Sequence, residues 1–352
     1  MAYTTINKST DYFNTKLYTG NGGTQSIDVG FQSDFTWLKS RTEAKNHVLI
    51  DAVRSSSKNI HSNLTNAEDT NATRITGFDS DGFNLGSSST TNTNSQNYVS
   101  WNWKANGQGS SNTDGSINTT YTSVNTTAGF SISQYTGNAS SGATIGHGLG
   151  SVPKMILVKN LSIASNWLVY NYSMSANGDY ALFLDSTSAK DNSQDYWGDT
   201  TPTSSVFSLG ARQEGNGSGN SHIAYCFADV QGYSKFGSYV GNGNADGTFI
   251  YTGFAPAFII YKHTTDGYSW IMEDVKRNIA GNGYLNGSAS REFYPDANNA
   301  EGTAGQRFDF LSNGFKIRET SADINESGST FIYMAFDEAP LVGSNNTPCT
   351  AR

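Results

Sequence analysis

The sequence predicts an all-β protein made of three tandem, related antiparallel β-sandwich modules of the jelly-roll or lectin-like kind. Three observations lead to this fold class. The 352 residues include 37 Gly, 19 Tyr and 19 Phe but only 15% charged residues, as in chains with many short strands and turns. Apolar hexads alternate with the period of a strand. One set of landmarks occurs three times along the chain.

The landmarks follow the same order in each copy. A tyrosine before a Gly/Asn turn comes first, and an apolar run ending in lysine follows. A turn before a phenylalanine comes next, and an apolar hexad closes the copy. In the order of the chain these landmarks are Tyr18, Tyr135 and Tyr239; Lys39, Lys159 and Lys262; Phe83, Phe207 and Phe315; and the hexads 98–103, 222–227 and 331–336. The period of about 110 residues is long enough for a small β-sandwich.

These landmarks divide the chain into modules at residues 1–106, 124–230 and 231–340. The Gly/Ser/Asn/Thr-rich stretch 107–123 is expected to be a linker, and 341–352 a polar tail. The connection between the second and third modules is short, so these two are expected to pack tightly together.

The hexads alternate between an apolar and a more polar face, which predicts half-buried strands. The runs that end in lysine are continuously apolar, which predicts central strands buried on both faces. Cys226 lies inside the second hexad and is expected to be a small core residue. Cys349 lies in the polar tail, so a disulfide framework is not predicted.

Helix signals are scarce. Asp51 and Arg54, like Asp274 and Arg277, place opposite charges three residues apart. This spacing predicts a short helical turn with a surface ion pair, which stabilises a protein by roughly a few tenths of a kcal/mol.

Charge and hydropathy exclude several classes of function. The net charge is −8 and the Lys and Arg residues are scattered singly, so a nucleic-acid binder is not expected. No stretch reaches the roughly 18 apolar residues of a membrane span, so membrane insertion is not expected. The N-terminus lacks the apolar region of a signal peptide, which favours folding in a reducing compartment.

No catalytic residue, cofactor or metal ligand is predicted. Residues 79–82 (DSDG) look like the start of a calcium loop but lack the glutamate that such a loop needs, which favours a hairpin turn. The five histidines show no zinc-binding spacing, and no GxSxG motif occurs. Glu273 and Asp274, near Trp270, form the most suggestive acid pair for a glycosidase, but no feature singles them out. The chain is therefore expected not to be an enzyme.

Carbohydrate contact requires exposed aromatic rings, and several aromatic residues lie in or near polar loops. Those predicted as glycan contacts are Trp197, Tyr196, Tyr268 and Tyr172. Trp197 is notable because it has no counterpart in the other copies. His47, Trp167 and Trp270 occupy one shared position, eight residues after the lysines, and are expected to be core residues.

The motifs as a set resemble a family of uncharacterised proteins of tailed bacteriophages, common in marine phages. The resemblance rests on YTGNG, GFQSDFTWLKSR, FDSDGFNLG, NYVSWNWKANG, IGHGLGSVPKMILVKN, GYSKFGSYVGNG and STFIYMAF, and it runs from Tyr18 to Phe336. It implies a virion component built of repeated β-rich domains, and it provides no catalytic residues.

The resemblance and the sequence together lead to a structural protein of the virion exterior, assembled in the bacterial cytoplasm. The favoured form is a tail appendage or fibre-type adhesin that contacts host surface glycans. The alternative is a head decoration protein with a purely structural role, and a glycan-degrading enzyme is disfavoured. Expected partners are other virion proteins, host glycans and further copies of the chain, with a trimer as one candidate assembly.

Overall fold

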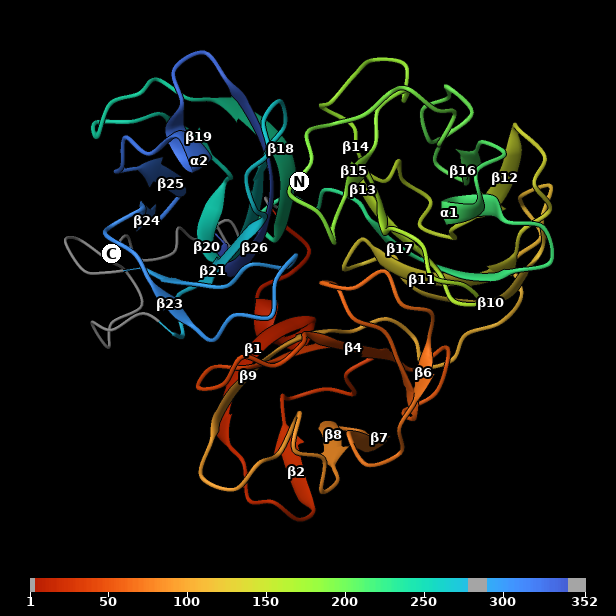
Figure 1. The fold of residues 1–352 in the computed structure, drawn as a ribbon, viewed down its shortest axis with the longest axis horizontal. Coiled ribbons are helices and arrows are strands. Elements are labelled where there is room, and N and C mark those ends of the chain that lie inside the picture. The colour runs from red at the N-terminus through yellow and green to blue at the C-terminus, as the bar shows by residue number, and fades with distance from the viewer. Residues whose placement is uncertain (1–3, 278–289, 341–352) are drawn as a thin grey trace.

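The protein consists almost wholly of antiparallel β-strands, which confirms the predicted fold class. The computed structural model describes residues 4–277 and 290–340 (Figure 1). Within this part, helix is limited to the 3-10 turn η1 (Ser9–Asp11) and the single turns α1 (Gln213–Asn216) and α2 (Ala322–Asn325). None of the helices in these ranges has the length and apolar character needed to cross a membrane. The predicted tail 341–352, with Cys349, lies outside the described residues.

Three large sheets have a common strand order, and the strand with the closing hexad lies second or third in each. The first sheet has the order β1-β9-β3-β4, from β1 (Phe13–Thr19), β9 (Asn97–Trp103), β3 (Phe35–Ser40) and β4 (Val48–Asp51). The second has the order β10-β11-β17-β13-β14-β15, from β10 (Thr119–Asn125), β11 (Phe130–Thr136), β17 (Ser221–Phe227), β13 (Met155–Asn160), β14 (Leu168–Asn171) and β15 (Leu182–Phe183). The third has the order β18-β26-β20-β21, from β18 (Ser234–Val240), β26 (Thr330–Pro340), β20 (Phe254–His263) and β21 (Ile271–Asp274). We refer to the chain from β1 to β9, from β10 to β17 and from β18 to β26 as the first, second and third sectors.

Each sector also contains a smaller sheet. Their orders are β2-β8-β7, from β2 (Gln25–Asp28), β8 (Gly82–Leu85) and β7 (Ile75–Asp79); β12-β16, from β12 (Ala143–Gly146) and β16 (Val206–Leu209); and β19-β25-β24, from β19 (Phe249–Tyr251), β25 (Gly314–Ile317) and β24 (Phe308–Leu311). Two short ribbons complete the fold: β5 (Lys58–Asn59) with β6 (Asp69–Thr70), and β22 (Arg291–Glu292) with β23 (Gly302–Thr303). A separate hydrophobic cluster lies between the large and small sheets of each sector.

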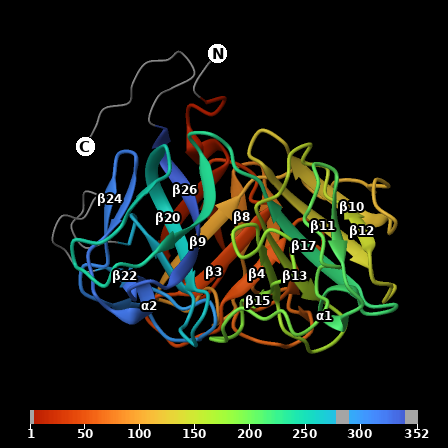
Figure 2. The same ribbon diagram turned by 90° about the horizontal axis from the view of Figure 1, so that it is seen from above.

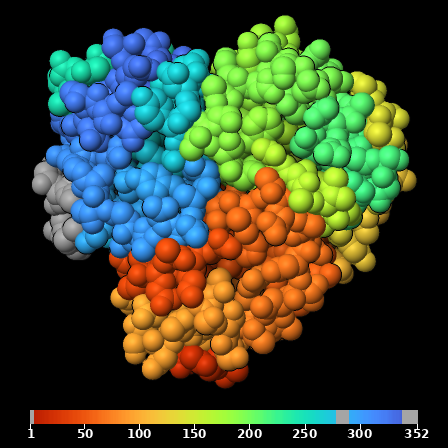
Figure 3. All heavy atoms as spheres, viewed as in Figure 1, coloured from red at the N-terminus to blue at the C-terminus, as the bar shows by residue number. Residues whose placement is uncertain are grey.

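The three large sheets also share one central core, which Figures 1 and 2 show as three groups of strands around the middle of the molecule. The rings of Phe35 and Tyr225 lie 4.4 Å apart, and those of Phe13 and Phe336 lie 4.9 Å apart. Burial of such aromatic area is a large stabilising contribution. The sectors therefore do not have wholly separate cores, and in the space-filling view they meet at the centre (Figure 3). The predicted limits at 1–106, 124–230 and 231–340 stay a prediction.

The prediction of half-buried hexads is wrong, because all three hexads are buried on both faces. In β17, Ile223, Tyr225 and Phe227 belong to the central core, whereas Ala224 and Cys226 pack between the sheets of the second sector. Cys226 is a buried free cysteine, as expected from its place in the hexad. The lysine-ended runs form β3, β13 and β20, which are buried throughout, as predicted.

The landmark tyrosines have the same surroundings in each sector. Each ring stacks on a ring of the closing hexad, and each hydroxyl donates to a backbone carbonyl next to a buried asparagine. The stacked pairs are Tyr18 with Tyr98, Tyr135 with His222 and Tyr239 with Phe331, and the accepting carbonyls belong to Thr91, Gly215 and Ile324. The turn glycine after each tyrosine is also required, because a Cβ at Gly20, Gly137 or Gly241 would lie within 2.4 Å of a backbone oxygen.

The landmark lysines connect the sectors. Each side chain is buried and its ammonium donates to a backbone carbonyl of another sector: Lys39 to Asn298 at 3.3 Å, Lys159 to Thr65 at 2.8 Å and Lys262 to Thr187 at 3.1 Å. Burial lowers the pKa of Lys39 to about 7, and the nearby charge of Arg277 acts in the same direction. Burial lowers the pKa of Lys159 and of Lys262 to about 8.

The shared position eight residues later forms a second set of connections. His47, Trp167 and Trp270 are buried, as predicted for core residues. Trp167 Nε1 donates to the His61 carbonyl at 2.9 Å, and Trp270 Nε1 donates to the Phe183 carbonyl at 2.8 Å. His47 Nδ1 accepts from an indole, so its Nε2 carries the proton and donates to the Tyr294 carbonyl at 3.1 Å. Each of these bonds to a carbonyl joins two sectors.

The predicted surface ion pairs are in fact buried. The side chains of Asp51 and Arg54 are at most 1% exposed, and those of Asp274 and Arg277 are fully buried. Asp51 also accepts from the Tyr225 hydroxyl at 2.7 Å. These pairs lie between two sectors instead of on the surface, because the outer strands that precede them pack against the neighbouring large sheet.

Part of the stretch predicted as a linker is a strand. Residues 119–125 form β10, which pairs with β11 from Thr119↔Tyr135 to Asn125↔Phe130. Ile117, just before it, bridges Ile145 of β12. This stretch therefore belongs to the sheets of the second sector.

Candidate binding site

The predicted glycan contacts Trp197 and Tyr196 lack the exposed ring face that stacking on a sugar needs. They are 2% and 5% exposed. Trp197 packs edge-on against Tyr170, and Tyr196 packs against Phe183 while its hydroxyl donates to Asp191 at 2.7 Å. Their loop has a polar composition, but it folds over the second sector and turns both rings inward.

Tyr268 and Tyr172 have more exposure. Tyr268 is half-buried beside His263, with ring centroids 5.2 Å apart. Tyr172 is 36% exposed, and the ammonium of Lys154 lies 4.4 Å from its ring centroid. The four predicted contacts thus have different neighbours and do not form a common surface. None of the four lines the hollow described next, although Tyr172 acts electrostatically on Lys235 of its wall.

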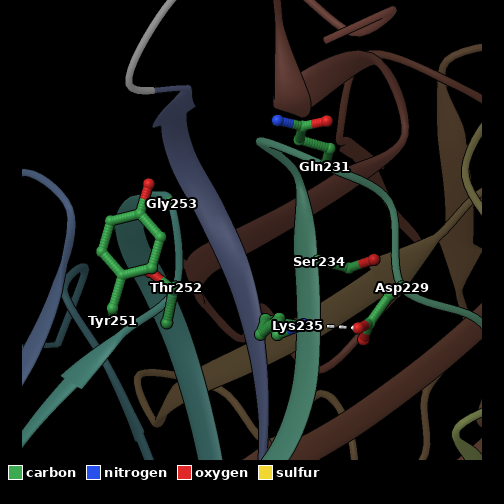
Figure 4. Close-up of a pocket in the computed structure, with 7 residues that line it drawn as sticks. All are labelled: Asp229, Gln231, Ser234, Lys235, Tyr251, Thr252 and Gly253. Carbon is green, nitrogen blue, oxygen red and sulfur yellow. Dashed lines mark hydrogen bonds and ion pairs between the residues drawn. The ribbon is translucent and has the colours of Figure 1, made fainter. Parts of the chain in front are cut away.

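A surface hollow of about 410 Å³ lies between the end of the second sector and the third sector. Its volume falls within the range of small-molecule sites. Three stretches contribute its lining, which is Asp229, Gln231, Ser234, Lys235, Tyr251, Thr252 and Gly253. Figure 4 shows Tyr251 on one side and the Lys235–Asp229 pair on the other, with Gln231 at a third position.

A fixed ion pair forms one wall of this hollow. Lys235 Nζ lies 2.7 Å from Asp229 Oδ2, and Asp229 Oδ1 accepts the backbone N–H of Phe236 at 2.9 Å. Burial acts to lower the pKa of Lys235, but the hydrogen bond and charge of Asp229 outweigh it and the pKa is raised. Tyr172 also interacts electrostatically with Lys235, which places it near this wall. Lys235 therefore keeps its charge at neutral pH, and the two hydrogen bonds of Asp229 hold the pair in position.

The opposite wall provides an aromatic ring. Tyr251 is 55% exposed. An exposed ring facing an ordered ammonium–carboxylate pair can stack on an apolar face of a ligand whose hydroxyls bond to the pair. Ser234 Oγ donates to the Ala228 carbonyl, so this hydroxyl is not set up as a nucleophile with a base.

Tyr251 was missed from the sequence because it lies on a strand and not in a polar loop. The register shows the signal that could have found it. Ile250 pairs with Phe315 as Ile145 pairs with Phe207 and Ile27 with Phe83. The residue after each isoleucine is Tyr251, Gly146 or Asp28, so an exposed aromatic residue replaces a small or charged one.

The hairpin turn predicted at residues 79–82 is confirmed. Asp79 pairs with Gly82 across a two-residue turn, and Asp79 Oδ2 accepts from Asn84 Nδ2 at 2.7 Å. This carboxylate is therefore used within the hairpin.

Among the described residues, His263, Asp266 and Glu326 form a group whose atoms are close enough to hold a metal ion. The hydrogen bonds disfavour that use. His263 Nδ1 accepts two backbone N–H groups, from Thr265 and Asp266, so Nε2 keeps its proton and donates to Glu326 at 2.9 Å. A histidine ligand needs a free lone pair on the nitrogen that faces the metal. We therefore interpret the group as a hydrogen-bonded corner of the fold.

The acid pair Glu273 and Asp274 does not face a common cleft. Both residues are fully buried, and neighbours on a strand point to opposite faces. Burial raises the pKa of Glu273 to about 8. Asp274 is held by Arg277 and by Trp101 Nε1, which donates at 3.0 Å. A solvent-accessible pair of catalytic carboxylates is not formed by these two residues.

The fold and the hollow define an all-β antiparallel protein with three large sheets around one core and an open surface hollow. The chain belongs to the family described as a domain of unknown function (DUF7483), whose sequence model matches residues 8–340. Neither the curated proteins nor the solved structures provide a match.

Proposed function

We propose that the chain is a structural protein of a tailed-phage virion surface, most specifically a tail appendage or fibre-type adhesin that binds host surface glycans. The resemblance of its motifs to proteins of tailed phages supports the virion. The hollow between Tyr251 and the Lys235–Asp229 pair is the observation that carries the glycan contact.

The chemistry of the hollow fits a sugar. A pyranose has an apolar face of C–H groups, which Tyr251 can stack against, and a rim of hydroxyls. The Lys235 ammonium donates to such hydroxyls, and the Asp229 carboxylate accepts from them. Tyr172, under the Lys154 ammonium, provides a second exposed ring near the same wall.

A head decoration protein is the second candidate. The shared central core and the bonds between sectors favour it, because they make a rigid body suited to a load-bearing shell. Copy number per virion separates the two: hundreds of copies indicate decoration, whereas a few tens or fewer indicate a tail appendage.

Binding of the purified chain to host cells and to an array of host glycans tests the proposal. We expect binding that Tyr251→Ala and Lys235→Met each weaken about tenfold, or about 1.4 kcal/mol. Phe249→Ala is the matched control, because it removes an exposed aromatic residue of the same strand that does not line the hollow. No binding to any host glycan, together with an even distribution of the protein over the capsid, would contradict the proposal.

A further inference from the structure

The second sector covers the edge of its large sheet with a strand of its own. β10 pairs antiparallel with β11 along residues 119–125, so β11 has a neighbour on both sides. The first and third sheets begin directly with β1 and β18, the strands that correspond to β11.

The stretch before β10 covers the edge of the smaller sheet as well. Ser116 and Thr144 exchange hydrogen bonds, each backbone N–H donating to the other's side-chain oxygen, at 2.8 and 2.9 Å. Asn112 lies directly over Gly146, where a Cβ would come within 1.7 Å of Asn112 Oδ1. Residues 112–125 therefore cover both edges of the second sector, first as a loop that is closed by the Thr119 N–H bond to the Asn112 carbonyl at 3.0 Å and then as β10.

The corresponding positions of the third sector carry exposed aromatic residues. The register that aligns Ile250 with Ile145 places Phe249 where Thr144 stands and Tyr251 where Gly146 stands. Phe249 is 43% exposed and Tyr251 is 55% exposed. In the first sector the same two positions are the exposed polar residues Ser26 and Asp28. This surface is thus polar in the first sector, covered by residues 112–125 in the second, and aromatic and exposed in the third.

The backbone of β18 also faces outward along this edge. Phe236 N–H donates to Asp229, and the Val240 carbonyl accepts from Thr248 Oγ1 at 2.7 Å, which shows that even-numbered residues point their backbone groups away from β26. By the alternation of an antiparallel ladder, the N–H and C=O of Ser238 point the same way. Ser238 is exposed, and Val240 is 53% exposed. In the described part of the chain, β26 is the one strand that pairs with β18.

We propose that this edge of β18 and β19 binds an extended segment of another protein by strand addition. The segment lies antiparallel beside residues 236–240 and bonds to the N–H and C=O of Ser238, since Phe236 N–H and Val240 C=O are already bonded to Asp229 and Thr248. Its preceding residues cover Phe249 and Tyr251. The intramolecular segment indicates the chemistry of this partner, because residues 117–125 (INTTYTSVN) contain no charged side chain and are rich in β-branched and hydroxyl residues. The partner is therefore an uncharged, Thr/Ser-rich strand, and this inference goes beyond the proposed glycan binding because it requires a polypeptide.

Physical reasons favour an occupied edge. Unpaired strand edges with apolar side chains promote aggregation unless something covers them. Exposed aromatic residues next to such an edge are typical of binding hot spots, and Tyr is among the residues enriched there. Strand addition provides both the backbone hydrogen bonds and the cover for the two rings.

A synthetic peptide of residues 112–125 is the probe, titrated onto the full chain. We expect saturable binding with new hydrogen-exchange protection at the outward N–H groups of Ser238 and Val240. Ser238→Pro removes the outward N–H without removing a bond to β26, and it should weaken binding by at least about tenfold. Ser238→Ala is the matched control and should bind as the parent does. The double substitution Phe249→Thr and Tyr251→Gly, which copies the second sector at two exposed positions, should also weaken binding.

Absence of saturable binding, or equal binding to the Ser238→Pro chain and to the double variant, would overturn the proposal. If the Ser238→Pro chain does not fold, the double variant and the exchange data still decide. Self-association without peptide that depends on Ser238 would show a second copy as the occupant and would also contradict it. Tyr172→Ala should weaken glycan binding and leave peptide binding unchanged, so the two proposals fail separately.

Discussion

The indole of Trp270 donates to the backbone carbonyl oxygen of Phe183 at 2.8 Å, and this bond joins the third sector to the second. The indole of Trp197 is also buried, but its Nε1 has no hydrogen-bond partner within the described residues. Substituting each tryptophan in turn therefore separates the contribution of the indole hydrogen bond to stability from that of the buried ring.

Trp270→Phe should destabilise the protein more than Trp197→Phe. Both changes remove similar apolar volume, but the first removes the indole bond to the Phe183 carbonyl and leaves it only the longer bond from the Ser186 N–H at 3.3 Å, which costs about 1 kcal/mol. Urea unfolding of both variants measures the difference. Equal losses of unfolding free energy would contradict the role of the indole in joining the sectors.

The buried pair Asp51–Arg54 should show strong coupling. Arg54→Met alone leaves the Asp51 carboxylate uncompensated, which costs about 3–5 kcal/mol. Combining Asp51→Asn with Arg54→Met copies Asn171 and Met174, the residues at these positions in the second sector, and should recover much of that loss. A double-mutant cycle by chemical denaturation measures the coupling. Additive effects of the two single substitutions would show that the pair does not act as a unit.

Glu273→Gln should change how stability depends on pH. Burial raises the folded-state pKa of Glu273 to about 8 from its ordinary 4.5. The folded state then binds more protons than the unfolded state between these values, so the parent loses stability relative to the variant as pH rises from about 4.5 to 8. We expect a difference on the order of a few kcal/mol between about pH 5 and pH 8. Parallel stability curves for the two proteins would contradict a buried, neutral Glu273.

Lys39→Met should show the opposite dependence. The pKa of Lys39 is lowered to about 7, so between pH 7 and the ordinary value of 10.5 the unfolded state binds more protons. The parent therefore gains stability relative to the variant as pH rises through this window. The backbone N–H groups of Trp167 and Trp270 donate to the carboxylates of Asp185 and Asp296, which act on Lys159 and Lys262. In the first sector the corresponding acceptor is the amide of Asn63, which accepts the His47 N–H, so Lys39 lacks the carboxylate at this position.

The same lysine-to-methionine change at Lys262 is the control for Lys39→Met. The parent should begin to gain stability relative to Lys262→Met about one pH unit higher, because the pKa of Lys262 is lowered only to about 8. Chemical denaturation at a series of pH values measures both curves. A flat difference between the parent and Lys39→Met from about pH 7 to 10 would show that burial does not penalise the ammonium.

Period-two patterns and repeated landmarks were sufficient to predict the β class, the central lysine-ended strands and the shared core position of the tryptophans. They could not predict burial on both faces of the hexads, because Asn102 and Ser100 look like surface residues. In the fold, Asn102 Nδ2 donates to the Asn14 carbonyl and to the Ser100 hydroxyl, so its polar atoms are satisfied inside. Nor does composition show that large sheets pack against one another.

The site was harder to predict than the fold. The polar loop around Trp197 suggested exposure, but loop composition does not determine which way a ring turns. Tyr251 lies on a strand, where an aromatic residue is expected in the core, and its exposure follows only from the register of β19 with β25. The repeated buried asparagines Asn92, Asn216 and Asn325 were missed for the same reason, since their common role in accepting a turn N–H is visible only in three dimensions.

The most direct test of the central claim is calorimetric titration of a host surface glycan, selected on the array, into the full chain and into its Tyr251→Ala and Phe249→Ala variants. We expect the parent and Phe249→Ala to bind with the same affinity and Tyr251→Ala to bind about tenfold more weakly. Equal affinity of all three proteins would contradict the placement of glycan binding in the hollow between Tyr251 and the Lys235–Asp229 pair.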